Sequence, residues 1–139
     1  MKESGILNSD IASIISRQGH GDLLLITDAG FAIPRGIEVI DIALSENQPR
    51  VIDLLNELKK HFSVEKIIMA NQTKKTNPSY FNEIMSAFDD DTEVETIDHR
   101  ELKKLSESVK AVIRTGDFTA YANVILVSGA GDRWYSETK

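Results

Sequence analysis

A histidine and an aspartate flank a short apolar run near the start of the chain. His20 lies between two glycines in RQGHGDLLLITDAG (residues 17–30), and Asp28 directly follows the apolar run. An imidazole titrates at about pH 6.5, so it can give or take a proton near neutrality, while a carboxylate can accept a proton or bind hydroxyl groups. His20 can equally bond the last carbonyls of a helix, and Asp28 before Ala-Gly suits a turn. Acid–base chemistry and local structural roles are both open for this pair.

Three further polar residues adjoin other apolar segments. His99 follows residues 94–98, and Tyr121 and Asn123 open the last apolar segment. These side chains could bind a ligand, but His99 can simply begin a helix, Tyr121 can anchor a surface, and Asn123 can lie at a strand edge. His61 falls at the end of an expected helix, where the helix dipole and solvent account for it. We therefore do not assign His61 to a site.

The residue types limit the chemistry. The sequence contains no cysteine, no glycine-rich phosphate-binding fingerprint, no metal-ligand spacing and no nucleophile elbow, so it predicts neither a metal nor a cofactor. Proton transfer by His and Asp, with hydrogen bonding by Tyr, Asn, Arg and Lys, suits a neutral, polyhydroxylated ligand. Opening a sugar hemiacetal is one such reaction, because it needs only a proton delivered to the ring oxygen and another removed from the anomeric hydroxyl. It is one possibility among several.

Strand-like and helix-like segments alternate along the chain. The expected strands cover residues 23–27, 39–44, 66–70, 94–98, 111–116 and 121–129, and the expected helices begin near residues 9, 49, 78 and 99. This alternation predicts one α/β domain over residues 1–139. It has three layers, a mostly parallel or mixed sheet of about six strands with helices on both faces. The connection at 116–121 is too short for a parallel crossover, so the last strand is expected to break the parallel order.

This arrangement separates the first two candidates. Ligands of open α/β sheets collect beyond the carboxyl ends of the strands, which is where Asp28 and His99 are expected. His20 precedes the strand that Asp28 follows, so the two should lie roughly 20 to 25 Å apart. His20 therefore either contributes to a site that another subunit completes, or is structural.

The composition excludes several classes of protein. Asp and Glu number 22 against 16 Lys and Arg, which gives a net charge of -6 and argues against a nucleic-acid partner. The N-terminal residues lack the apolar core of a signal peptide, and no apolar stretch approaches the roughly 20 residues that span a bilayer. The sequence thus predicts a cytoplasmic protein with no membrane association.

Four motifs, in order along the chain, resemble the D-ribose pyranase family, which is related to the fucose mutarotases. They are LNSDI, GHGD, DAGFAIP and the IRTG segment that leads to YAN, and the similarity runs from about residue 5 to residue 126. The resemblance implies a cofactor-independent isomerase. Such an enzyme interconverts the pyranose and furanose forms of D-ribose and so supplies ribofuranose for phosphorylation. DAG followed by IP fits the ribose branch better than the fucose branch.

The resemblance also implies roles for individual residues. His20 matches the family's proton donor, and the positions that match its substrate-binding residues are Asp28, His99, Tyr121, Ala122 and Asn123. Members of the family form ring-shaped homo-oligomers, typically decamers, with active sites at subunit contacts. His20 of one subunit would then face Asp28 and Tyr121 of its neighbour.

The chain departs from the family pattern in three places. Residues 71–74 read NQTK where relatives often carry an acidic pair before the lysine, Ala120 stands where proline usually precedes the tyrosine, and SGAGDRWYSETK replaces a short apolar tail. These departures bear on two alternatives. One is a mutarotase of another sugar such as fucose, and the other is a non-catalytic sugar-binding or regulatory protein that keeps the pocket without turnover.

Overall fold

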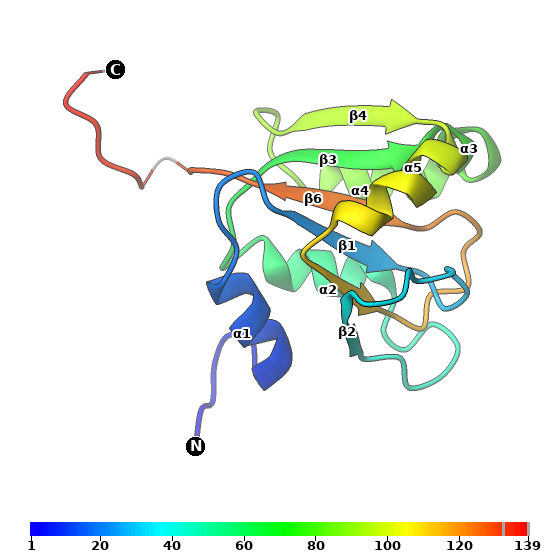
Figure 1. Cartoon of the computed structure of the whole chain (residues 1–139), viewed down its shortest axis with the longest axis horizontal. Helices are drawn as coiled ribbons and strands as arrows, with labels where there is room; N and C mark the ends of the chain where they lie inside the picture. Colours follow the sequence, from blue (N-terminus) through cyan, green and yellow to red (C-terminus); the bar gives the residue numbers. More distant parts are fainter. Residues whose placement is uncertain (132, 139) are drawn as a thin grey trace.

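A six-stranded mixed sheet forms the centre of the molecule (Figure 1). The computed structural model describes residues 1–131 and 133–138. The strands are β1 (Leu23–Thr27), β2 (Glu38–Asp41), β3 (Val64–Ala70), β4 (Glu93–Ile97), β5 (Ala111–Arg114) and β6 (Val124–Ser128), in the order β2-β5-β1-β6-β3-β4. Neighbouring strands are parallel except β6, which runs antiparallel to both β1 and β3. The predicted mixed sheet and the reversed last strand are confirmed.

Helices cover both faces of this sheet, as predicted. One face carries the larger apolar core, to which α1 (Ser9–Ser16), α2 (Val51–Leu58) and α4 (Pro78–Ser86) contribute. The other face is covered by α5 (His99–Leu105) and a short 3-10 turn (Ser106–Ser108), with Leu102 packed in a smaller core. Leu24 and Ile26 of β1 enter the larger core and Leu25 enters the smaller one. A strand that is apolar on both faces is thus buried on both faces.

Local sequence explains where the first two helices begin. The Asn8 side chain accepts hydrogen bonds from the backbone N–H groups of Asp10 and Ile11, which have no partner inside α1. At the start of α2 the direction is reversed: the carboxylate of Asp53, in the first turn, accepts from the backbone N–H of Arg50, the residue before the helix. The apolar positions of α2 then recur every three or four residues, so that its buried stripe faces the sheet.

The structure differs from the sequence prediction in three segments. The strand expected over residues 39–44 is β2, which ends at Asp41. The polar stretch NQTKKT forms the helix α3 (Asn71–Thr76). The sequence did not predict this helix, because the stretch has no apolar residues at helical spacing. The last strand begins at Val124 rather than near Tyr121, because Tyr121 adopts a left-handed backbone conformation with φ of 58° that a strand cannot contain. Residues 120–123 are therefore a shaped loop before β6.

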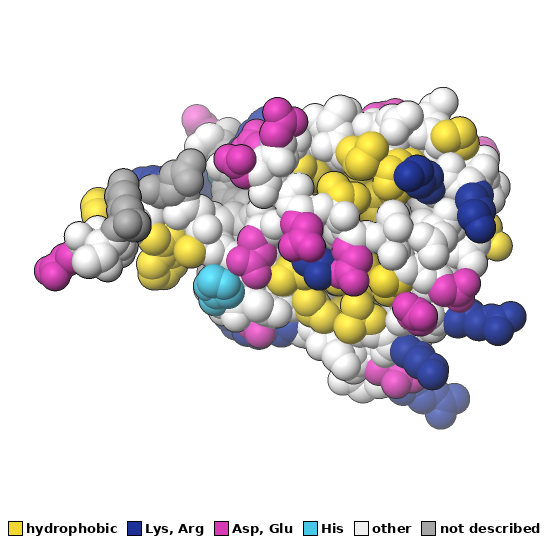
Figure 2. Space-filling model, turned by 90° about the horizontal axis from the view of Figure 1, so that it is seen from above, with side chains coloured by type: hydrophobic (Ala, Val, Ile, Leu, Met, Phe, Trp, Pro, Cys, Tyr) yellow, Lys and Arg dark blue, Asp and Glu magenta, His cyan; other side chains and the backbone are white. Residues whose placement is uncertain are grey.

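The surface carries charges of both signs. On the face seen in Figure 2, Lys and Arg side chains are interspersed with Asp and Glu, and hydrophobic side chains show between them. No helix within residues 1–131 and 133–138 has the length and apolar character needed to cross a membrane. In the same residues no three His, Asp or Glu side chains gather in a way that could hold a metal ion.

Candidate active site

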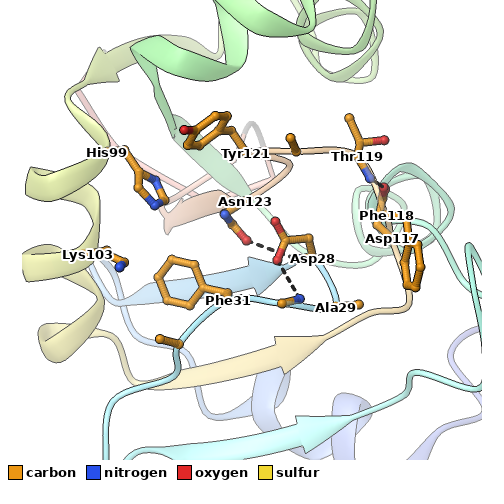
Figure 3. Close-up of a pocket in the computed structure, with 13 residues that line it drawn as sticks. Asp28, Ala29, Phe31, His99, Lys103, Asp117, Phe118, Thr119, Tyr121 and Asn123 are labelled. Carbon is orange, nitrogen blue, oxygen red and sulfur yellow. Dashed lines mark hydrogen bonds between the residues drawn. The ribbon is translucent and has the colours of Figure 1, made fainter.

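A cavity of about 610 Å³ opens beyond the carboxyl end of β1 (Figure 3). Three separate segments line it: the turn after β1, the start of α5, and the loop between β5 and β6. Four of the sequence-predicted residues line this cavity, namely Asp28, His99, Tyr121 and Asn123. The loop that connects β5 to β6 comes close to β1 because β6 pairs directly with β1. The reversed last strand thus brings Tyr121 and Asn123 beside Asp28.

Asp28 and Asn123 meet directly in this cavity. The backbone N–H of Asp28 donates to Asn123 Oδ1 at 2.9 Å, and Asn123 is only 3% exposed. One carboxylate oxygen of Asp28 accepts from the N–H of Gly30 at 3.0 Å. Burial raises the pKa of Asp28 above its usual value, although the N–H groups that it accepts from act in the opposite direction. The Asn123 amide oxygen is thus used internally, which leaves its NH₂ group for a ligand.

His99 packs against Tyr121 in the same cavity. Their rings pack edge to face with centroids 5.1 Å apart, and Phe31 lies at 6.3 Å on the other side of the imidazole. Burial lowers the pKa of His99, and the nearby Lys103 ammonium lowers it further. The imidazole is therefore neutral at pH 7, and its buried Nδ1 has no hydrogen-bond partner among the described residues. A neutral imidazole in this position can accept a hydrogen bond from a ligand hydroxyl or donate one.

Gln72, in one of the three segments that depart from the family pattern, holds the backbone of His99 in place. The Gln72 side-chain oxygen accepts from the backbone N–H of His99 at 3.0 Å, and its NH₂ group donates to the Asp98 carboxylate at 3.2 Å. Asp98 in turn caps α5 by accepting the N–H of Arg100. The glutamine in NQTK therefore fixes the start of the helix that carries His99.

Three side chains from α3, α4 and the junction between them hold the Tyr121 loop through consecutive carbonyl groups. Asn77 donates to the Ala120 oxygen at 2.8 Å, Thr73 to the Tyr121 oxygen at 2.5 Å, and Tyr80 to the Ala122 oxygen at 2.8 Å. Burial raises the pKa of Tyr80, so its hydroxyl stays a donor. We call Thr73, Asn77 and Tyr80 the loop clamp. It holds the backbone around Tyr121 in a conformation that costs about 1–3 kcal/mol for a residue with a side chain.

Ala122 contributes through its backbone alone. Its side chain is fully buried, and its backbone N–H acts to lower the pKa of the Asp28 carboxyl, against the effect of burial.

Several cavity residues were missed in the sequence. Asp117 is 1% exposed, and its carboxylate accepts from the N–H of Thr119 at 2.8 Å and of Val51 at 3.0 Å. Its carbonyl oxygen accepts from the Ala29 N–H, so Asp117 ties both cavity loops to the start of α2. Asp117 follows β5 as Asp28 follows β1, and the same strand-end argument could have found it. The other missed lining residues include Phe31, Lys103, Phe118 and Thr119.

His20 lies away from this cavity, in the turn that precedes β1. Its side chain is 67% exposed, and its Nε2 atom is 3.2 Å from Oε2 of Glu65. It borders a second hollow, of about 340 Å³, together with His61, Ser128 and Trp134 of the C-terminal segment. Within one subunit, therefore, the structure brings together all the predicted site residues except His20.

Comparison with known proteins places this fold. The sequence model of the RbsD / FucU transport protein family matches residues 1–131. The chain belongs to this family. A D-ribose pyranase of Streptococcus uberis is 46% identical over 129 residues, which cover 93% of this chain and 98% of the relative. A D-ribose pyranase of Clostridium perfringens is 43% identical over the same length and the same shares.

A solved structure of the RbsD / FucU family gives the same result. Bacillus subtilis RbsD in complex with D-ribose superposes with a TM-score of 0.89 at 40% identity, over 94% of this chain and 99% of that one. The fucose mutarotase of Streptococcus pneumoniae, at 19% identity and a TM-score of 0.73, shares the fold. The predicted membership of the ribose pyranase group is thus confirmed. Trp134 lies beyond the matched region of the family.

Proposed function

We propose that this protein interconverts the pyranose and furanose forms of D-ribose. The observation that carries the proposal is the cavity that gathers Asp28, His99, Tyr121 and Asn123 in a chain 46% identical to a D-ribose pyranase. A carboxylate, a neutral imidazole, a phenol and an amide supply hydrogen-bond donors and acceptors for the hydroxyl groups of an uncharged sugar. The similar Bacillus subtilis RbsD binds D-ribose.

The proposed reaction assigns the role of proton donor to His20, which does not line the cavity of its own subunit. His20 protonates the ring oxygen of ribopyranose while the anomeric hydroxyl passes its proton to the Asp28 carboxylate, and the hemiacetal opens to the aldehyde. Asp28, His99, Tyr121, Asn123 and the backbone of Ala122 hold the hydroxyl groups. Attack by a different hydroxyl on the aldehyde then closes the five-membered ring. That hydroxyl gives its proton to His20, and Asp28 returns its proton to the former carbonyl oxygen. Neither a metal nor a cofactor takes part in this scheme.

Because His20 is at the other end of β1, the scheme requires a second subunit. We propose a homo-oligomer, a decamer as in the family pattern, in which His20 of one subunit enters the cavity of its neighbour. The exposed imidazole of His20 and the open mouth of the cavity are compatible with this arrangement. The furanose product would feed a sugar kinase in the cytoplasm.

Saturation-transfer NMR on D-ribose tests the activity. The protein should accelerate exchange between the ring forms, and His20→Ala should remove most of that acceleration, which for general acid catalysis is typically about 100- to 10,000-fold. His61→Ala, which changes another exposed histidine, serves as the control and should keep full activity. Binding of D-ribose without accelerated exchange would support the non-catalytic sugar-binding protein, and faster exchange on fucose than on ribose would support the fucose mutarotase.

Mixing two inactive proteins tests the shared site. His20→Ala and Asp28→Ala subunits that exchange into common oligomers should recover part of the activity, since some contacts then combine an intact His20 with an intact Asp28. Mixed oligomers that form and stay as inactive as their parents would refute a site shared between subunits.

A further inference from the structure

We propose that Glu65 is a positioning residue for His20, with its carboxylate holding Nε2 of the imidazole so that Nδ1 faces the sugar. The proposal rests on the proposed role of His20 as proton donor. The first observation is the contact itself, 3.2 Å between Glu65 Oε2 and His20 Nε2. A carboxylate beside one imidazole nitrogen orients the ring and fixes which nitrogen faces away from it.

The second observation is a break in the strand pairing at Glu65. Along β3 and β6, Val64 pairs with Ser128 and Lys66 pairs with Val127, so that Glu65 is the extra residue between two consecutive pairs. Such a bulge bends the strand locally and redirects a side chain, and bulges are common beside active sites. In a regular register, Glu65 would have its own partner on β6. The bulge instead leaves it free to reach the turn before β1.

The third observation is the space that Gly129 leaves for the Glu65 side chain. A Cβ atom at Gly129 would lie 2.4 Å from Glu65 Oε2 and 2.6 Å from Glu65 Cβ, closer than real Cβ contacts allow. The φ of Gly129 is not in the left-handed region, so the backbone does not require glycine there. Glycine at position 129 is therefore explained by the space that the Glu65 side chain occupies.

The fourth observation is that His20 and Glu65 are tied to the same end of β6. Ser128 accepts the N–H of Gly21 at 2.7 Å, and its hydroxyl donates to the Gly19 oxygen, so Ser128 holds the residues on both sides of His20. Val64, the residue before Glu65, pairs with the same Ser128. The imidazole and the carboxylate therefore both extend from segments that are attached to one residue of β6.

The test replaces Glu65 by glutamine, which keeps the shape of the side chain and removes its charge. Glu65→Gln should slow ribose ring exchange by a factor of about 2 to 5, the range of a partly exposed ion pair, with the affinity for D-ribose unchanged. The ¹⁵N resonance of His20 Nε2 should shift. Glu95→Gln is the matched control, since Glu95 is similarly exposed, lies on β4 and pairs with Lys66 rather than with a histidine. It should change neither the exchange rate nor the His20 resonance.

A double-mutant comparison separates positioning from general stability. If Glu65 acts through His20, Glu65→Gln in the His20→Ala protein should cause no further loss of exchange. Gly129→Ala should slow exchange to a similar degree, because the added Cβ displaces Glu65. An unchanged exchange rate in folded Glu65→Gln, or an equal loss in the presence and absence of His20, would overturn the proposal. Full activity of His20→Ala would overturn the proposed function instead, so the two failures are distinguishable.

Discussion

Removal of one hydroxyl from the loop clamp should cost both stability and ligand affinity. Tyr80 is 5% exposed and donates to the carbonyl of the fully buried Ala122 at 2.8 Å. Tyr80→Phe keeps the ring in the core and deletes only this donor. A buried carbonyl left without its partner costs about 1–3 kcal/mol.

The size of the expected thermal shift follows from the length of the chain. An unfolding entropy of about 2.1 cal/mol/K per residue gives roughly 0.3 kcal/mol/K for a chain of this size, so the midpoint should fall by roughly 3 to 10 °C. The loosened segment also releases Tyr121 from its left-handed conformation. A loss of about 1 kcal/mol in ribose binding, close to fivefold in Kd, is then expected.

Two measurements check this reasoning. Circular dichroism gives the thermal midpoint, and titration calorimetry gives the affinity for D-ribose. Tyr135→Phe is the control, because Tyr135 is fully exposed and its hydroxyl should contribute to neither quantity. An unchanged midpoint in Tyr80→Phe would refute the hydrogen bond as a source of stability. A lowered midpoint with unchanged affinity would refute the role of the clamp in shaping the site.

Other substitutions should affect ligand binding and stability in directions that follow from the environment of each residue. Asp28→Asn should weaken D-ribose binding by about tenfold or more in calorimetry, the cost of a charged hydrogen bond. In urea unfolding it should leave stability equal or higher, because burial raises the pKa of Asp28 and its ionised form costs stability at pH 7. The pKa of His99 is lowered in the folded protein, so as the pH falls the unfolded chain binds a proton at this histidine before the folded chain does. The free energy of unfolding should therefore fall as the pH drops below about 6.5. His99→Gln should lose this pH dependence. Gly116→Ala should be strongly destabilised in thermal unfolding, because its Cβ would lie 2.3 Å from the Ser45 carbonyl oxygen, whereas Gly30→Ala, with open space around it, should unfold like the original protein.

Much of the fold was predictable because its strands are apolar runs of ordinary length. LLLIT reads as a strand buried on both faces, and the five-residue β1 has these bounds. The reversal of β6 followed from the short connection after Gly116. The meeting of Asp28 and Asn123 then followed from the rule that ligands collect at strand ends.

The parts that escaped prediction depend on contacts between distant residues. NQTKKT has no apolar spacing, and its role becomes clear only where Thr73 meets the Tyr121 carbonyl, 48 residues away. Glu65 sits in a strand whose Val-Glu-Lys alternation is typical of a solvent-facing carboxylate. Only the bulge against β6 turns it toward His20. Single-sequence patterns report local periodicity, and these features are not local.

One short strand separates His20, which would enter the cavity of a neighbouring subunit, from Asp28, which lines the cavity of its own subunit. β1 is five residues long, and Leu24, Leu25 and Ile26 are fully buried in two cores. In the proposed ring, each copy of this strand therefore lies between two different sugar molecules, with His20 beside one and Asp28 beside the other. In that arrangement a substitution inside β1 would alter two half-sites at once, one in each of two neighbouring cavities.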